Sequence, residues 1–318
     1  MTRTIHTIGN LGTGTMGRGT ALQFAMAGYD VHLIGRSQGS LDAAMARIRD
    51  DAEELFANGL MRDGDTVETV IARITTYSDT AAGVADVDFI IESIVEDLDV
   101  KREVWHEVEQ HAPDDAIFAT NTSGLSPSAI QSALERPERF VIAHFWNPVH
   151  LMPLVEVVPG ESTAPEVVET TYELMKAIGK KAVKLNRESL GFVGNRMQLA
   201  LLREALAIIR EGIADADAVD TVVKYSLGRR WNVLGPIASI DLGGLDTFRN
   251  VSEYLYADLD AGQGPDPLLA EKVAAGDLGA KTGQGFYPWS GETGRQTIAY
   301  RDQALMQALK ADQADQAA

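Results

Sequence analysis

The feature that most constrains this chain is a glycine-rich run near its beginning, Gly12-x-Gly14-x-x-Gly17. An apolar segment typical of a short strand precedes it, and a helix is predicted from Thr15 to Ala27. The first glycine permits a tight turn, the second lets the backbone approach a pyrophosphate, and the third lets helix and strand pack closely. Amide groups at the helix start, around Thr15 and Met16, then face the anion. The run therefore predicts a dinucleotide site.

The turn after the second predicted strand, at residues 31–34, indicates which dinucleotide is bound. An acidic residue here usually bonds the ribose 2′-hydroxyl of NAD, whereas this chain has Gly35, Arg36 and Ser37. The missing carboxylate removes repulsion of a 2′-phosphate, and an arginine with a hydroxyl offers that phosphate charge-assisted partners. An arginine that only opens a surface loop is the alternative. We therefore favour NADP(H) and leave NAD(H) open.

Strands and helices alternate along the first part of the chain. Further strands are predicted at 70–74, 87–91, 116–119, 140–143, 153–158 and 181–184, and helices at 41–56, 97–111 and 165–178. This alternation predicts an α/β domain, a Rossmann-type doubly wound parallel sheet. After Gly191 the predicted segments are all helical, at 192–213, 216–227, 245–260 and 267–275. We expect a dinucleotide-binding domain at 1–187 and an all-helical C-terminal domain at 188–318, fraying after Ala304.

Composition narrows the classes of partner. A length of 318 residues suits two domains, and a formal net charge of −18 argues against nucleic-acid binding. Cysteine is absent, which excludes disulfides, thiol nucleophiles and cysteine-ligated zinc, and fits a cytoplasmic protein. Charged residues interrupt the most apolar predicted helix, at 192–213, and the first residues lack a signal-peptide pattern. We expect a protein without a metal site that does not bind membranes.

Polar residues gather where the predicted strands end. They are Glu92 and Glu96, then Asn121, Thr122 and Ser123, and then the run from His144 to Pro148. Ligands of doubly wound sheets bind beyond these carboxyl ends. The sequence therefore predicts the reactive site at this edge.

A nicotinamide enzyme that oxidises an alcohol needs a base for the hydroxyl proton, and histidine suits this because its pKa is about 6.5. Of the six histidines, His144 lies at the carboxyl end of a predicted strand beside Asn147. Glu156 lies in an apolar strand, where an unpaired carboxylate is costly to bury. A contact between His144 and Glu156 would satisfy the acid and fix the imidazole tautomer. His150 is the reserve candidate, and a structural core histidine is the alternative.

Several motifs, in the same order along the chain, together resemble the L-3-hydroxyacyl-CoA dehydrogenase family. They are Gly12 to Gly17, Asn121-Thr122-Ser123, His144 to Pro148, Leu154-Val155-Glu156, Gly191 to Arg196, Gly235-Pro236, Asp241, Gly244-Leu245-Asp246 and Lys281 to Tyr287. The resemblance implies an oxidoreductase that interconverts an L-3-hydroxyacyl-CoA, or a related 3-hydroxy acid, and its 3-keto form.

The same resemblance implies roles for individual residues. His144 would be the general base and acid with Glu156 as its partner, and Ser123 and Asn195 would bond the substrate oxygen. Glu96 and Lys101 would lie near cofactor and substrate, with Asn121 also at the cofactor. The helical domain would hold the substrate pocket and form a homodimer.

Two departures from the family pattern matter. Gly35 and Arg36 stand where the family usually ends its second strand in aspartate, and Pro153 stands where acyl-CoA members usually carry a lysine. The Pro-Leu-Val-Glu form resembles family branches that act on free hydroxy acids, such as carnitine and gulonate dehydrogenases. Arg229 and Arg230 could bind a substrate carboxylate or be solvated. A free hydroxy acid as substrate is therefore one alternative, and a non-catalytic relative such as a lens crystallin is another.

Overall fold

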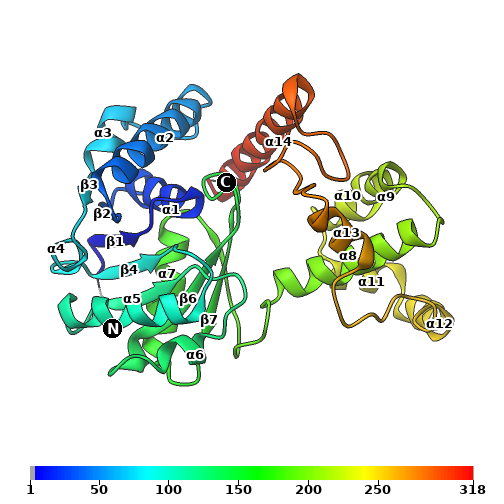
Figure 1. Ribbon diagram of the computed structural model, residues 1–318, viewed down its shortest axis with the longest axis horizontal. Helices are drawn as coiled ribbons and strands as arrows, with labels where there is room; N and C mark the ends of the chain where they lie inside the picture. Colours follow the sequence, from blue (N-terminus) through cyan, green and yellow to red (C-terminus); the bar gives the residue numbers. More distant parts are fainter. Residues whose placement is uncertain (1–3, 318) are drawn as a thin grey trace. The chain divides into compact units, whose positions relative to one another are not determined.

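The computed structural model describes residues 4–317, which divide into two compact units (Figure 1). The first unit holds the chain up to Asn195 together with the chain from Arg301 onward, and the second is Arg196–Tyr300. The expected boundary lay between residues 187 and 188, with everything beyond it in the helical domain. The observed division differs from this expected boundary. Residues 188–195 and the segment from Arg301 onward group with the first unit and not with the helical one.

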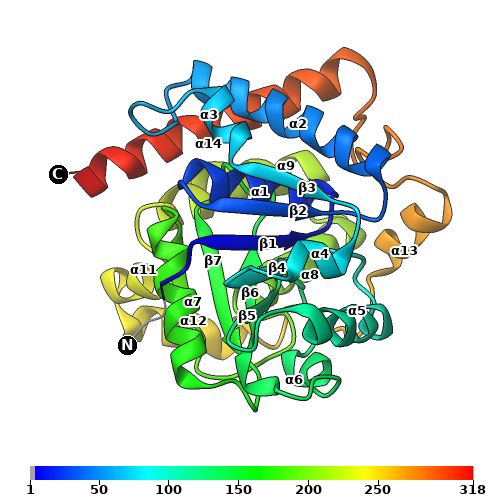
Figure 2. The same ribbon diagram turned by 90° about the vertical axis from the view of Figure 1, so that its left-hand side faces the viewer.

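An eight-stranded sheet forms the centre of the first unit, in the order β3-β2-β1-β4-β5-β6-β7-β8 (Figure 2). Its strands are β1 (Thr7–Leu11), β2 (Asp30–Ile34), β3 (Ile74–Tyr77), β4 (Phe89–Glu92), β5 (Ile117–Thr120), β6 (Phe140–Phe145), β7 (Leu154–Pro159) and β8 (Lys181–Lys184). The strand order reverses between β1 and β4, where doubly wound sheets bind their ligands. The predicted Rossmann-type class is confirmed.

One strand pair departs from the parallel arrangement. β6 and β7 pair antiparallel, with His144 opposite Glu156, whereas each other neighbouring pair among the described strands is parallel. Only residues 146–153 connect the two strands, and a parallel crossover needs a dozen residues or more. The predicted parallel sheet therefore contains one antiparallel pair among its described strands.

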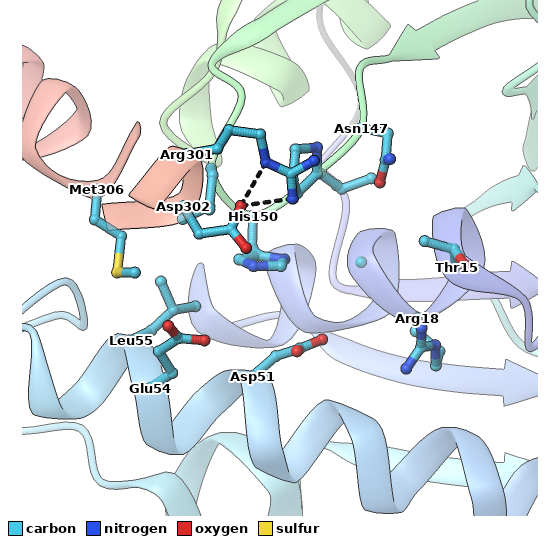
Figure 3. A pocket seen from close by; sticks show the side chains of 14 residues that line it. Thr15, Arg18, Asp51, Glu54, Leu55, Asn147, His150, Arg301, Asp302 and Met306 are labelled. Carbon is cyan, nitrogen blue, oxygen red and sulfur yellow. Dashed lines mark hydrogen bonds and ion pairs between the residues drawn. The ribbon is translucent and has the colours of Figure 1, made fainter. Parts of the chain in front are cut away.

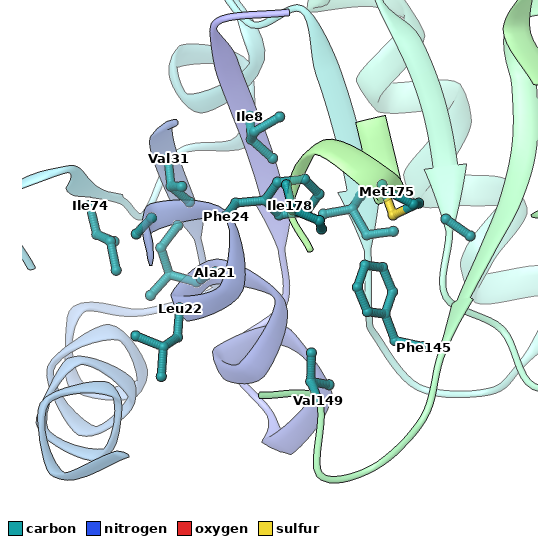
Figure 4. Packing of buried hydrophobic residues seen from close by; sticks show 14 of the residues in the cluster. Ile8, Ala21, Leu22, Phe24, Val31, Ile74, Phe145, Val149, Met175 and Ile178 are labelled. Carbon is teal, nitrogen blue, oxygen red and sulfur yellow. The ribbon is translucent and has the colours of Figure 1, made fainter. Parts of the chain in front are cut away.

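Helices cover both faces of the sheet. They are α1 (Thr15–Met26), α2 (Gln38–Ala57), α3 (Val67–Ala72), α4 (Thr80–Val84), α5 (Leu98–His111), α6 (Pro127–Gln131) and α7 (Pro165–Ala177). One core joins α1, α2, α3 and α7 to the sheet around the fully buried Phe24 (Figure 4). A second core lies under α4, α5 and α6, where Trp105 stacks on Phe118 with ring centroids 5.1 Å apart.

The strand expected at residues 70–74 is wrong for most of its length. Residues 67–72 form α3, and the strand begins only at Ile74. The side chains of Thr66 and Thr69 form a capping box that starts this helix. β-branched residues such as Val70 favour strands. Here the helix places Val70 in the core that also contains residues of α1 and α2, and this burial favours the helix.

The second unit is helical, as predicted. Its helices are α8 (Gly194–Arg210, which begins in the first unit), α9 (Ala216–Val222), the π-helical turn η2 (Val223–Leu227), α10 (Gly228–Trp231), α11 (Pro236–Gly243), α12 (Leu245–Leu255) and α13 (Pro267–Ala274). From α9 to α13 no helical residue described is buried. In residues 4–317, no helix is long and apolar enough to span a bilayer.

The C-terminal residues form a long helix, α14 (Gly291–Ala317), so the expected fraying after Ala304 is wrong. Met306 is only 5% exposed and belongs to the same core as Leu55 of α2. Leu305 and Leu309 pack against that core as well. These apolar residues recur at helical spacing, and their burial stabilises a segment whose Gln-, Asp- and Ala-rich composition resembles a tail.

Candidate active site

The glycine loop has the geometry that a dinucleotide requires. Gly12 has φ of 113°, and a Cβ atom there would lie 2.3 Å from the Ser93 carbonyl oxygen. A Cβ on Gly17 would lie 2.1 Å from the Gly12 carbonyl oxygen, so this glycine allows the close approach of α1. Gly14 instead faces open space, and no side chain caps α1 at this position. Uncapped amide groups beside an open glycine fit a pyrophosphate.

Two buried side chains fix this loop, and sequence reasoning missed both. Asn10 in β1 donates to the Gly17 carbonyl at 3.0 Å, and its amide oxygen accepts from the Thr20 hydroxyl at 2.6 Å. Both side chains are fully buried. An asparagine inside an apolar strand, just before the glycines, is the signal that could have revealed them.

Three residues in the turn after β2 have different roles. A Cβ atom on Gly35 would lie 2.6 Å from Thr13 Cγ2, so glycine lets the turn pack against the glycine loop. Ser37 caps α2 by accepting from the Ser40 amide. Arg36 is exposed and forms no hydrogen bond or ion pair with the described part of the chain. Its guanidinium is therefore available to an anion.

His144 and Glu156 form a buried dyad at the carboxyl end of β6. His144 Nδ1 lies 2.9 Å from Glu156 Oε2, and the two residues are 4% and 1% exposed. The other carboxylate oxygen accepts from the backbone amides of Val193 and Gly194, each at 3.0 Å. Burial alone would raise the pKa of Glu156, but these three hydrogen bonds outweigh it and lower the pKa. The carboxylate is thus ionised behind the imidazole.

Aromatic rings fix the position of the imidazole. Phe192 meets His144 edge-on with ring centroids 5.3 Å apart, and Trp146 lies at 5.4 Å. Phe192 has φ of 52°, a left-handed conformation that non-glycine residues rarely adopt. This strained residue directly precedes the Val193 and Gly194 amides, so its conformation helps to aim them at Glu156.

A second buried network lies where β4 ends. Lys101 is 1% exposed, and its ammonium lies 2.6 Å from Glu92 Oε1 and 3.5 Å from Glu96 Oε2. Glu92 also accepts from Trp105 Nε1 and the Thr120 hydroxyl. The sequence marks Glu92 as a polar residue at a strand end, but its pairing with Lys101 depends on how α5 packs against the sheet.

Glu96 connects this network to the predicted substrate residues. Its Oε1 accepts from the Thr122 hydroxyl and, at 2.9 Å, from the Ser123 amide. The Ser123 carbonyl in turn accepts from Asn195 Nδ2 at 2.9 Å. The structure therefore brings together Ser123, Asn195 and Glu96, and leaves the Ser123 side chain exposed.

Asn121 has a structural position at the same edge. Its amide oxygen accepts from the Phe145 amide at 2.7 Å, and its nitrogen donates to Ser93 at 3.2 Å. The side chain thus ties the end of β5 to the end of β6 and to the loop after β4. It fixes the backbone beside His144.

His150, the reserve candidate, lies in a separate cluster. It lines a cavity with Arg18 and Asp51 (Figure 3), and burial lowers its pKa although Asp51 acts in the opposite direction. It does not contact the dyad through any interaction found among residues 4–317. Arg229 and Arg230 belong to α10 in the second unit, where both are exposed.

Two family models together match most of the chain. The model described as 3-hydroxyacyl-CoA dehydrogenase, NAD binding domain, matches residues 7–189. The model described as 3-hydroxyacyl-CoA dehydrogenase, C-terminal domain, matches residues 191–289.

Curated relatives match at full length or nearly so. The chain is 33% identical to 5-formyl-3-hydroxy-2-methylpyridine 4-carboxylate 5-dehydrogenase of Mesorhizobium japonicum, over 95% of this chain and 96% of the relative. It is 37% identical to 3-hydroxybutyryl-CoA dehydrogenase of Clostridioides difficile, over 88% of this chain and 98% of the relative. A crystal structure of a 5-formyl-3-hydroxy-2-methylpyridine 4-carboxylic acid 5-dehydrogenase, described as an NAD+ dependent dismutase, matches with a TM-score of 0.90 at 31% identity, covering 98% of this chain and 99% of that one.

Proposed function

The chain belongs to the 3-hydroxyacyl-CoA dehydrogenase family, and we propose that it interconverts a hydroxyl and a carbonyl group held beside His144. The observation that carries this proposal is the buried His144–Glu156 dyad at the carboxyl edge of a sheet whose glycine loop fits a dinucleotide. A nicotinamide dinucleotide, when bound, supplies the acceptor and donor of the hydride.

In this proposal His144 acts as the general base of the oxidation and the general acid of the reduction. With Nδ1–H donating to Glu156, the other ring nitrogen is free to accept the hydroxyl proton. The ionised Glu156 then stabilises the imidazolium that forms. Glu156 cannot turn away, because two backbone amides hold its second oxygen.

Ser123 and Asn195 are proposed to bond the substrate oxygen. The exposed Ser123 hydroxyl and the Asn195 amide come from segments joined by the hydrogen bond between Asn195 Nδ2 and the Ser123 carbonyl. Glu96, itself beside the buried Lys101, fixes the Ser123 backbone. Glu96 and Lys101 are thus proposed to shape the loop that cofactor and substrate share.

For the substrate, we place a small free acid before a coenzyme A thioester. The relative named for a pyridine carboxylate matches 95% of this chain, whereas the 3-hydroxybutyryl-CoA dehydrogenase matches 88% of it. Pro153, directly before Leu154-Val155-Glu156, supports the same choice. A 3-hydroxyacyl-CoA is the second candidate, supported by the family itself.

Reduction assays on free 3-keto acids, acetoacetyl-CoA and aromatic aldehyde acids test this proposal. We expect turnover of a free acid, and His144→Ala should reduce it about a hundredfold or more while dinucleotide affinity stays nearly unchanged. An unchanged kcat would refute the dyad assignment. A protein that binds the dinucleotide but turns over none of these substrates would support a non-catalytic relative.

For the cofactor, we propose NADP(H), on the strength of the free Arg36 beside the α2 N-terminus. The family description and the NAD+ dependent relative favour NAD(H). Comparing kcat/KM for both cofactors decides between them, with Arg36→Ala as the variant. NADP(H) preference that Arg36→Ala abolishes supports our proposal, and strong NAD(H) preference in the parent refutes it.

A homodimer through the helical unit is also proposed. Val233, Ile237 and Leu242, around α11, are 81%, 71% and 79% exposed, and helices α9 to α13 bury no described residue. So much exposed apolar surface marks an interaction site. Light scattering of the parent should give twice the mass of one chain, and Leu242→Asp should lower the measured mass. A parent that scatters as a monomer contradicts this proposal.

A further inference from the structure

Residues 188–195, which end in the first turn of α8, form a segment that contacts the dyad through its backbone. The amides of Val193 and Gly194 each donate to Glu156 at 3.0 Å. Phe192, directly before them, has φ of 52°, and a non-glycine residue in this left-handed region persists only where surrounding contacts fix it. The contacts that hold this segment therefore decide where the two amides point.

Glu188 anchors the beginning of the segment to the loop that follows β5. Its Oε2 accepts from the Ser126 hydroxyl at 2.8 Å and from the Ser128 backbone amide at 3.3 Å. Ser126 is also the N-cap of α6, so the carboxylate is bound where this helix begins. Glu188 is half-buried in this position, whereas Arg187 beside it is exposed.

Asn195 anchors the end of the segment to the same loop. Its Nδ2 donates to the Ser123 carbonyl oxygen at 2.9 Å, three residues before Ser126. The loop after β5 thus holds the segment at both ends, and Glu156 accepts from the two amides between them. Because both ends are bonded to one loop, the backbone between them has little freedom to turn its amides away from the carboxylate.

We propose that Glu188 is a positioning residue of the reaction, which anchors this segment so that its two backbone amides stay on Glu156. The same anchor keeps the Asn195 side chain beside Ser123. The inference rests on the proposed function, because Glu188 acts on the reaction only through these residues. Without the anchor, Phe192 is free to relax toward an ordinary backbone conformation, which withdraws the amides from the dyad.

The pKa of Glu156 reports whether the amides are in place. Burial raises this pKa, but the hydrogen bonds from His144 and from the amides of Gly194 and Val193 together outweigh burial and lower it. His144 is the titratable side chain that faces the carboxylate, at 2.9 Å. Withdrawal of the amides should therefore raise the pKa of Glu156. Loss of a residue that merely stabilises the fold would leave this pKa in place.

Three variants of the full-length chain test the anchor. Glu188→Ala removes both hydrogen bonds, Ser126→Ala removes one of the two donors, and Glu188→Gln keeps an acceptor oxygen for both donors while removing the charge. Glu161→Ala, which removes an exposed acid just beyond β7, is the matched control, and His144→Ala tests the proposed function in the same assay.

Two readouts are measured for each variant. The first is kcat for reduction of acetoacetate and of acetoacetyl-CoA. The second is the pKa of Glu156 from the pH titration of its carboxyl 13C resonance, which is assigned by its absence in Glu156→Gln. This second readout needs no turnover, so it decides the anchor whatever the substrate is. Dinucleotide titration and urea unfolding accompany both.

We expect Glu188→Ala to lower kcat about tenfold and to raise the pKa of Glu156 by about half a unit to one unit. Glu188→Gln should restore both values to within about twofold in kcat, and Glu161→Ala should match the parent. The losses in kcat of Glu188→Ala and Ser126→Ala should not add in the double variant, because the two changes break the same hydrogen bond. Dinucleotide affinity should stay nearly unchanged.

The anchor and the proposed function fail in different ways. An unchanged pKa of Glu156 in Glu188→Ala overturns the anchor, even where His144→Ala abolishes turnover and so supports the proposed function. A raised pKa of Glu156 that Glu188→Gln reverses supports the anchor, even where His144→Ala leaves kcat unchanged and so contradicts the proposed function.

Discussion

Replacing Glu156 by glutamine tests the centre of the proposed site with almost no change of shape. The carboxylate accepts three hydrogen bonds, from His144 Nδ1 and from the amides of Val193 and Gly194. A glutamine can keep its oxygen on the two backbone amides, because these donors admit only an acceptor. Its NH2 group then faces His144 Nδ1, which must accept. The imidazole proton is thereby moved to the nitrogen that should take the substrate proton.

The expected loss follows from this wrong tautomer. General base catalysis contributes about 10² to 10⁴, and the same amide-for-carboxylate change behind a catalytic histidine costs about 10⁴ in kcat. We therefore expect kcat to fall by about 10² to 10⁴, equivalent to about 3–6 kcal/mol of barrier at 1.4 kcal/mol per tenfold. KM and dinucleotide affinity should change little, since Glu156 is buried behind the imidazole.

The assay is steady-state kcat with the best substrate, accompanied by dinucleotide titration and urea unfolding. Glu161→Gln, an exposed acid just beyond β7, is the control and should behave like the parent. The lowered pKa of Glu156 adds a check. Because the folded-state pKa is below the unfolded one, its stabilisation is present above about pH 4.5 and is lost as pH falls through the folded value. Glu156→Gln should lack that acid-side loss, and a kcat within threefold of the parent would refute the dyad.

Three further predictions concern the supports of the site. Gly17→Ala should lower the free energy of unfolding by about 1–3 kcal/mol, because its Cβ would lie 2.1 Å from the Gly12 carbonyl oxygen. Gly14→Ala should weaken only dinucleotide binding, since Gly14 faces open space. Urea unfolding and dinucleotide titration compare the two variants, and equal destabilisation would contradict the geometry. Lys101→Met should lower the free energy of unfolding in urea by about 3–5 kcal/mol, because it leaves the Glu92 carboxylate without its ion-pair partner. The double variant that also carries Glu92→Gln should recover part of this loss. An unchanged free energy of unfolding in Lys101→Met would refute the buried ion pair. Lys180 is buried, and its side-chain nitrogen donates to the backbone carbonyl oxygens of Val149 and Met152 in the loop between β6 and β7. Burial lowers its pKa to about 7, below the unfolded value, so its contribution to stability is lost as pH falls toward 7. The parent should therefore gain about 1–3 kcal/mol of stability relative to Lys180→Met between pH 7 and 9, and parallel pH curves for the two proteins would refute this.

Features that depend on neighbouring residues could be predicted from the sequence. The glycine spacing predicts a tight turn, an open position and a close helix contact, and Gly12, Gly14 and Gly17 occupy these three environments in that order. The position of His144 at a strand end followed from the apolar run before it. Each of these needs only the local chain and the geometry of one strand and one helix.

Features that depend on packing could not be predicted in this way. The helical state of residues 67–72 depends on a capping box and on burial by α1 and α2, against the strand preference of its β-branched residues. The C-terminal helix appears polar and repetitive in sequence, and only its contact with α2 shows that Leu305, Met306 and Leu309 have a core to enter. The pairing of Glu92 with Lys101 likewise joins a strand to a helix across the sheet edge.

The dyad shows how the two kinds of information combine. The sequence predicts a contact between His144 and Glu156 from the cost of burying a carboxylate, but the antiparallel pairing that sets them opposite each other follows from the short connection between β6 and β7. The second carboxylate oxygen of Glu156 accepts from Val193 and Gly194, in the part of the first unit that precedes Arg196. Both residues bond it through backbone amides and not through side chains. The run Gly191 to Arg196 therefore contributes to the site in two ways: the direction of its backbone amides and the side chain of Asn195. A substitution that changes the φ of Phe192 should disturb the dyad without touching either of its members.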